Sequence, residues 1–112
     1  MFEIRNNFIK ITKGDSASIK VNLTNDDGSD YVMQQGEKLR MTVRKAIDKE
    51  VLFSVESTSN ILDLTPRETK KLIKGSCFYD IQLETLAGDV FTVAGITDNM
   101  NANMFVLGEI TE

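Results

Sequence analysis

The sequence predicts an all-β fold, an immunoglobulin-like sandwich of two sheets with about eight strands and one short helix. Three observations lead to this prediction. Apolar and polar residues alternate in several segments, Gly with Asp or Asn marks turns between them, and one helix-start signal interrupts the pattern. A small barrel is the alternative architecture for the same set of strands.

The alternation is clearest in three segments, because every second side chain of a strand points to the same face. In the first segment Ile19, Val21 and Leu23 alternate with polar residues as far as Thr24. The second segment spans residues 39–44, with Leu39, Met41 and Val43 on one face, and the third spans residues 77–84. Weaker patterns predict five more strands, at residues 8–12, 51–56, 61–64, 90–94 and 104–110.

Turn residues separate these segments, since Gly adopts positive φ readily and Asp or Asn bonds its own backbone. Residues 25–28 (Asn-Asp-Asp-Gly) follow the first strand, and residues 87–89 (Ala-Gly-Asp) predict a hairpin turn before Val90. Residues 13–15 (Lys-Gly-Asp) join the strand at residues 8–12 to the strand that begins at Ile19, and residues 98–103 form a polar loop.

One segment has the start signal of a helix. Thr65 can cap it, Pro66 suits the first helical position, and Glu68 stands three residues after the cap. Gly75 can end the helix in a left-handed conformation. We therefore expect a helix of one to two turns, from Pro66 to about Lys74.

Length and composition predict one folded domain over residues 1–112. Hydrophobic residues make up 41% and charged residues 27%, which is typical of globular proteins. No apolar run has the length of a signal peptide or a membrane span, so we expect neither a cleaved leader nor a membrane partner. Cys77 is the only cysteine, which excludes a disulfide within the chain.

The net charge of −4 disfavours nucleic acid as a partner, because affinity for phosphates comes largely from Lys and Arg. The dense basic cluster of Lys70, Lys71 and Lys74 lies near Glu68, and we expect it to be a solvated helix face.

The residue types for catalysis are scarce, and we expect no catalytic, cofactor-binding or metal-binding residue. Histidine is absent, which excludes the Ser-His-Asp and Cys-His arrangements and removes the commonest ligand of transition metals. Cys77 shares a strand face with apolar residues, which predicts a buried, inert thiol. The cluster of Asp26, Asp27 and Asp30 does not have calcium-loop spacing and predicts a turn.

Two further functions stay open at this point. A hydrolase can use carboxylates alone, but Asp80 with Gln82 and Glu84 reads more simply as a solvated strand face. A carbohydrate-binding module could use aromatic side chains such as Tyr79, or Asn99 and Asn101 of the polar loop. Core packing is the simpler role for the aromatic residues of the predicted strands, which are Phe53, Phe78, Tyr79, Phe91 and Phe105.

The order of elements resembles the small N-terminal domain of bacteriophage upper baseplate and tail-fibre proteins. In the second half, residues 64–66 (Leu-Thr-Pro), a short helix, Gly75, residues 78–83 and residues 87–90 carry the resemblance. In the first half, residues 11–15, 25–28 and 39–45 follow the same order. The chain departs from the family at residues 32–36, where a Leu-Thr-Gly-type turn is usual, and it ends at Glu112 without a fibre or receptor-binding part.

The resemblance implies a non-enzymatic structural component of a phage or prophage tail or baseplate, with a scaffolding or adaptor role. Its partners are then other tail or baseplate proteins and further copies of itself in a homo-oligomer. Its location is the virion, or the bacterial cytoplasm before assembly. Residues 91–96 and 104–107 carry little charge, and we expect them to be candidates for strand pairing between chains.

Overall fold

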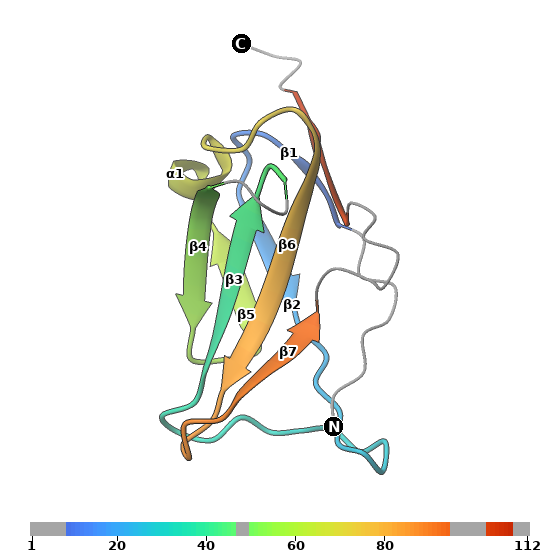
Figure 1. Cartoon of the computed structure of the whole chain (residues 1–112), viewed down its shortest axis with the longest axis vertical. Coiled ribbons are helices and arrows are strands. Elements are labelled where there is room, and N and C mark those ends of the chain that lie inside the picture. Colours follow the sequence, from blue (N-terminus) through green and yellow to red (C-terminus); the bar gives the residue numbers. More distant parts are fainter. Residues whose placement is uncertain (1–8, 47–49, 95–102, 109–112) are drawn as a thin grey trace.

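The computed structural model of the chain describes residues 9–46, 50–94 and 103–108, and these ranges contain eight strands and one helix. The strands form two separate sheets with a shared hydrophobic core (Figure 1). The prediction of an all-β sandwich with one short helix is therefore confirmed, and the described strands do not close into the alternative barrel. The strands divide six and two between the sheets, more unevenly than in a constant-type immunoglobulin domain.

The larger sheet is built around its longest strand, β6. Five of its strands follow in the order β1 (Ile9–Thr12), β8 (Met104–Leu107), β6 (Gly75–Glu84), β3 (Lys38–Arg44) and β4 (Val51–Ser57). The sixth, β7 (Val90–Ala94), pairs with the second half of β6 on the edge whose first half is taken by β8. The β1–β8 pair is parallel and the other pairs are antiparallel.

The position of β8 corrects the expectation that residues 104–107 pair with another chain. This strand has β1 on one side and β6 on the other, so its neighbours come from within the chain. For the other expected segment, 91–96, β7 pairs with β6 alone among the described strands, and residues 95 and 96 lie outside the described ranges.

The smaller sheet consists of β2 (Ala17–Lys20) and β5 (Ile61–Leu64), which run antiparallel with Ala17 opposite Leu64. The strand predicted from Ile19 to Thr24 thus has the wrong bounds. It ends at Lys20 because its partner begins at Ile61, opposite Lys20. Val21 and Leu23 continue the alternation into the core, although they belong to a loop and not to the ladder.

The core lies between the two sheets and follows the predicted alternation. On β3 the side chains of Leu39, Met41 and Val43 are buried, and on β6 every second side chain from Cys77 to Leu83 is buried. Leu62 and Leu64 of β5 belong to the same cluster. Truncating one such leucine to alanine typically costs about 2–5 kcal/mol of stability.

The helix α1 (Pro66–Thr69) starts where the sequence predicts but ends at Thr69, well before Lys74. A tight turn follows the helix. In it the Lys71 N–H donates to the Glu68 carbonyl at 3.0 Å, and the Leu72 N–H donates to the Thr69 carbonyl at 3.1 Å. Gly75 has positive φ, as expected, but it opens β6 and does not cap the helix. Among the described residues no helix is long and apolar enough to cross a membrane.

A side chain completes the sheet between β8 and β7. Both strands pair with the same edge of β6, and the backbone of Tyr79 lies between the two paired stretches. The buried amide of Asn103 accepts a hydrogen bond from the Tyr79 N–H and donates one to the Tyr79 carbonyl, both at 2.9 Å. The Asn103 side chain therefore makes the two hydrogen bonds that the backbone of a neighbouring strand would otherwise make with Tyr79.

Candidate protein-contact surface

The open edge of β4 is the first part of the candidate surface. Among the described strands β4 pairs with β3 on one side and with no strand on the other, where it ends the order of the larger sheet (Figure 1). Unpaired N–H and C=O groups along such an edge are a template for pairing with another chain. At seven residues β4 is longer than β1, the strand at the opposite end of the order.

The sequence of β4 (Val-Leu-Phe-Ser-Val-Glu-Ser) favours its extended conformation and contains no residue that commonly blocks an edge. Val and Phe favour extended backbone, and Phe53 is anchored in the core. The strand contains no Pro, Gly or Lys, the residues with which proteins commonly block an edge. Glu56 is its single charge, and Val51 at its start is an exposed apolar side chain.

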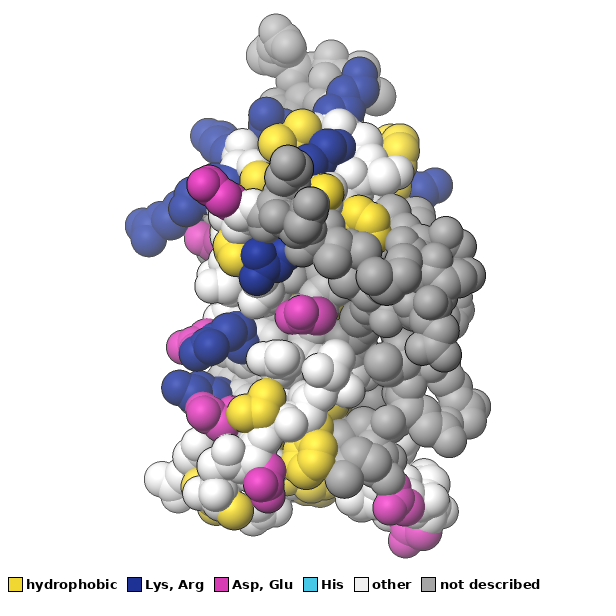
Figure 2. Space-filling view, viewed as in Figure 1, with side chains coloured by type: hydrophobic (Ala, Val, Ile, Leu, Met, Phe, Trp, Pro, Cys, Tyr) yellow, Lys and Arg dark blue, Asp and Glu magenta, His cyan; other side chains and the backbone are white. Residues whose placement is uncertain are grey.

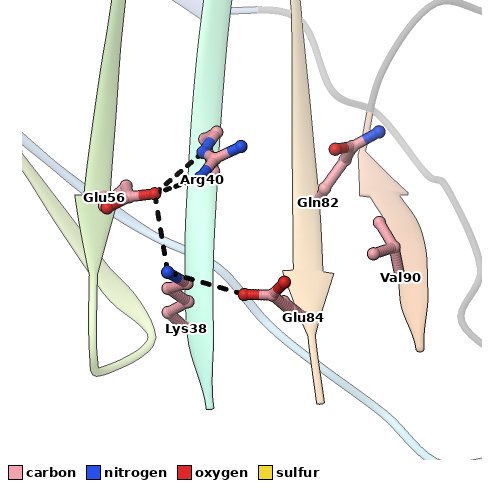
Figure 3. A pocket seen from close by; sticks show the side chains of 6 residues that line it. All are labelled: Lys38, Arg40, Glu56, Gln82, Glu84 and Val90. Atoms are coloured by element: carbon pink, nitrogen blue, oxygen red, sulfur yellow. Dashed lines mark hydrogen bonds and ion pairs between the residues drawn. The ribbon is translucent and has the colours of Figure 1, made fainter. Parts of the chain in front are cut away.

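A charge ladder made of Lys38, Arg40, Glu56 and Glu84 crosses the outer face of the larger sheet beside this edge (Figure 3). Arg40 lies opposite Glu56 on β4, and its Nε donates to Glu56 Oε2 at 2.9 Å. Lys38 lies opposite Glu84 on β6, with its Nζ 3.5 Å from Glu84 Oε2 and 4.0 Å from Glu56 Oε2. The ladder thus links β4, β3 and β6.

The electrostatics of the ladder follow from these contacts. The hydrogen bond from Arg40 and the charge of Lys38 lower the pKa of Glu56, and the same hydrogen bond raises the pKa of Arg40. All four side chains are substantially exposed, so water and salt screen their interactions. The ladder therefore contributes little to the stability of the fold. Its main effect is to place alternating positive and negative charges on the surface beside the β4 edge.

The ladder also lines a shallow pocket together with Gln82 and Val90 (Figure 3). Its volume of about 40 Å³ has room for a few water molecules, whereas small-molecule sites usually enclose about 300–1,000 Å³. The pocket is therefore too small to enclose a sugar ring or a cofactor.

The same pocket is the place to examine the carboxylate-only hydrolase. Because Glu56 and Glu84 both approach Lys38, at 4.0 and 3.5 Å, their Oε2 atoms lie at most 7.5 Å apart. This upper limit is compatible with a glycosidase pair, but such an enzyme also needs a carboxylic acid with a raised pKa. Glu56 has a lowered pKa, so it is poorly suited to donate a proton.

Asp27 and Asp80, which the sequence assigns to a turn and to a solvated strand face, lie in different surroundings. In the turn after Leu23, Asp27 Oδ1 accepts hydrogen bonds from the N–H and hydroxyl of Ser29, which lower the pKa of Asp27. Asp80 is half-buried on the outer face, where burial raises its pKa and the charge of Arg44 partly offsets this effect. Its face is therefore less solvated than we expect from the sequence.

The thiol of Cys77 is buried, as predicted. Burial raises its pKa to about 11, so little reactive thiolate forms at neutral pH. Within the described ranges no three Asp, Glu or Cys side chains come close enough to hold a metal ion.

The aromatic residues separate into two groups. Phe53 and Tyr79 are buried, and Phe91 packs against the core, as predicted. Phe78 and Phe105 are only half-buried and are not part of the core cluster, so the core prediction is wrong for these two. For a carbohydrate site, Tyr79 is too buried to stack on a sugar, while Asn99 and Asn101 lie outside the described residues.

Comparison with known proteins identifies no family for this chain. No protein-family model matches the sequence, and a search of curated proteins finds no significant match. The case for a function therefore rests on the fold, the β4 edge and the residues around it.

The sequence did not point to the β4 edge or to the charge ladder. Lys38, Arg40, Glu56 and Glu84 come from three segments, and only the pairing of β3 with β4 and β6 brings them together. The one local signal is the composition of residues 51–57, which carry a single charge, that of Glu56, and contain no Pro, Gly or Lys.

Proposed function

We propose that the chain is a non-enzymatic structural component of a phage or prophage tail or baseplate, which acts by assembling with other tail proteins. The observation that carries the proposal is the open edge of β4, seven residues long and without Pro, Gly or Lys. An edge of this kind binds a partner strand through main-chain hydrogen bonds. The resemblance to baseplate and tail-fibre N-terminal domains supplies the class of partner.

The shallow pocket supports the non-enzymatic part of the proposal. A site of about 40 Å³ is smaller than a usual small-molecule site, and Glu56, whose pKa is lowered by Arg40 and Lys38, is poorly suited to donate a proton. The same charges suit an interface, because opposite charges arranged beside an edge fix the register of a partner.

Site-specific photo-cross-linking tests the proposal in cells that produce the phage or the induced prophage. A photoreactive amino acid replaces Ser54, an exposed residue in the middle of β4, and in a control it replaces Asn22, an exposed residue of the loop after β2 that belongs to no strand. We expect position 54 to give discrete cross-links to tail or baseplate proteins and position 22 to give few.

Two results would count against the proposal. One is the same set of weak products from both positions, which would mean that the β4 edge has no specific partner. The other is glycan-array binding that is lost on substitution of Asn99 or Asn101, which would favour the carbohydrate-binding alternative.

A further inference from the structure

The two ends of the sandwich carry opposite charge. The pairing of the strands brings residues 13–16, 45, 46, 50 and 65–74 to one end, here called the basic end. It brings residues 25–37, 58–60 and 85–89 to the other, here called the acidic end. In Figure 1 the basic end is at the top, around α1, and the acidic end is at the bottom.

The charges of the two ends are nearly separate. Among the residues that the structure describes, the basic end contains six Lys or Arg residues and three acidic residues, and its densest part is Arg67, Lys70, Lys71 and Lys74. Among the same residues, the acidic end contains five Asp or Glu residues and no Lys or Arg, although Lys38 directly follows it. In Figure 2 dark blue side chains accordingly gather in the upper part of the visible face, and magenta ones occupy its lower end.

Apolar side chains add to the same division. Seven large hydrophobic residues of the described ranges are exposed by 40% or more, and all lie at or beside one of the two ends. Ile73 lies in the basic end with Val51 and Leu107 beside it, while Val32 and Leu86 lie in the acidic end with Ile61 and Val90 beside it. Exposed apolar side chains framed by charge are a common composition of protein contacts.

We infer that copies of the chain associate head to tail, with the basic end of one copy against the acidic end of the next. A second copy fits because it presents the complementary charge and its own apolar side chains. A two-fold contact through either end alone places like charges opposite each other, which is unfavourable. This inference deepens the proposed function, on which its biological role rests, by naming a second copy as one partner.

The size of the ends predicts a weak contact. The molecule measures 45 × 30 × 24 Å, so an end face covers roughly 550–700 Å² and a complete contact buries about twice that area. This value is at the low end of specific interfaces. Head-to-tail contacts close into a ring or continue as a filament, depending on the rotation between copies.

Sedimentation velocity of the full chain over a range of concentrations tests the inference. We expect association at about 20 mM salt that weakens about tenfold or more at about 500 mM salt, because salt screens exposed charges. A strict monomer up to about 100 µM protein at low salt, where weak interfaces still associate, would overturn the inference.

Two charge-reversal variants give a sharper test. Lys70→Glu with Lys71→Glu makes both ends acidic, and Asp26→Lys, Asp30→Lys and Asp89→Lys together make both ends basic. We expect each variant alone to lose self-association, and an equal mixture of the two to associate again. Lys10→Glu, on β1 and away from both ends, is the control and should associate like the wild type. Circular dichroism and thermal unfolding check that each variant is folded.

The two end variants, together with Ser54→Lys, distinguish the head-to-tail contact from a contact at the β4 edge. If both end variants are folded and associate like the wild type, the head-to-tail contact is wrong, and loss of association in Ser54→Lys would then place the contact at the β4 edge. If neither variant associates alone and the mixture also stays monomeric, the complementarity argued here is likewise contradicted.

Discussion

At the scale of single residues, Asn103 shows how one side chain can close a gap in a sheet. The Tyr79 N–H and C=O lie between the stretches of β6 that pair with β8 and β7, and they lose these two hydrogen bonds if the Asn103 amide is absent. An unsatisfied buried backbone group typically costs about 1–3 kcal/mol. Asn103 is therefore a structural residue, although it is polar and is the last residue of the polar segment 98–103.

We expect Asn103→Ala to lower the free energy of unfolding by about 2–4 kcal/mol, because both Tyr79 groups lose their partner. Urea unfolding measures the change. Asn60→Ala is the matched control, since the Asn60 amide makes one longer hydrogen bond, of 3.4 Å, to the Val21 carbonyl. A similar loss in both variants would show that the paired bonds to Tyr79 have no special weight.

The residue scale also marks the limit of what alternation can reveal. The buried face of β6 is predictable because each of its residues stands two positions from the next. The contact between Asn103 and Tyr79 spans 24 positions and depends on where β7 and β8 meet β6, which no local pattern encodes. For the same reason the outward position of Phe105 emerges only from its place on β8, opposite Ser76.

At the scale of elements, α1 combines a predictable start with an end set by its surroundings. Its start follows from Thr65, Pro66 and Glu68, which act locally. Its end follows from the tight turn at Lys71 and Leu72, in which Leu72 is buried and the chain then enters β6 at Gly75. The end of β2 depends in the same way on a distant residue, Ile61, where its partner strand begins.

The start of α1 predicts a pH dependence of stability. Glu68 Oε1 accepts hydrogen bonds from the Thr65 N–H at 2.9 Å and its hydroxyl at 2.7 Å, and these bonds lower the pKa of Glu68 below its usual 4.5. A carboxyl with a lowered pKa in the folded state stabilises the fold above the unfolded value, and the effect disappears as the pH falls through the folded value.

We therefore expect Glu68→Gln to lose less stability than the wild type between pH 6 and pH 3, because its side chain has no charge to lose. Urea midpoints at the two pH values measure the difference. Thr65→Ser keeps the hydroxyl donor and should retain the wild-type dependence. Identical losses in Glu68→Gln and the wild type would contradict the role assigned to this carboxylate.

The β4 edge is the element on which the functional proposal depends. Its composition is visible in the sequence, but its place at the end of the sheet is not, because strand order is a property of the whole topology. For the same reason, the lack of charge in residues 104–107 predicts pairing between chains, whereas the structure places these residues in a strand between β1 and β6.

At the scale of the whole molecule, we propose two surfaces for assembly, and the pocket lined by the charge ladder is far smaller than a usual ligand site. The β4 edge suits a partner strand, and the basic and acidic ends suit further copies of the chain. The net charge of −4 conceals this division, since it sums over two ends of opposite sign. Separate charged ends also favour oriented encounter, because complementary potentials steer association.

The most direct test of the central claim, a structural role in a phage tail, is quantitative mass spectrometry of tail particles from the strain that encodes the chain. The particles are purified after induction and washed in high salt. We predict that peptides of this chain remain in the particles in several copies per tail, in a fixed ratio to the other tail proteins. Their absence from intact particles, with the chain present in the surrounding lysate, would contradict the account.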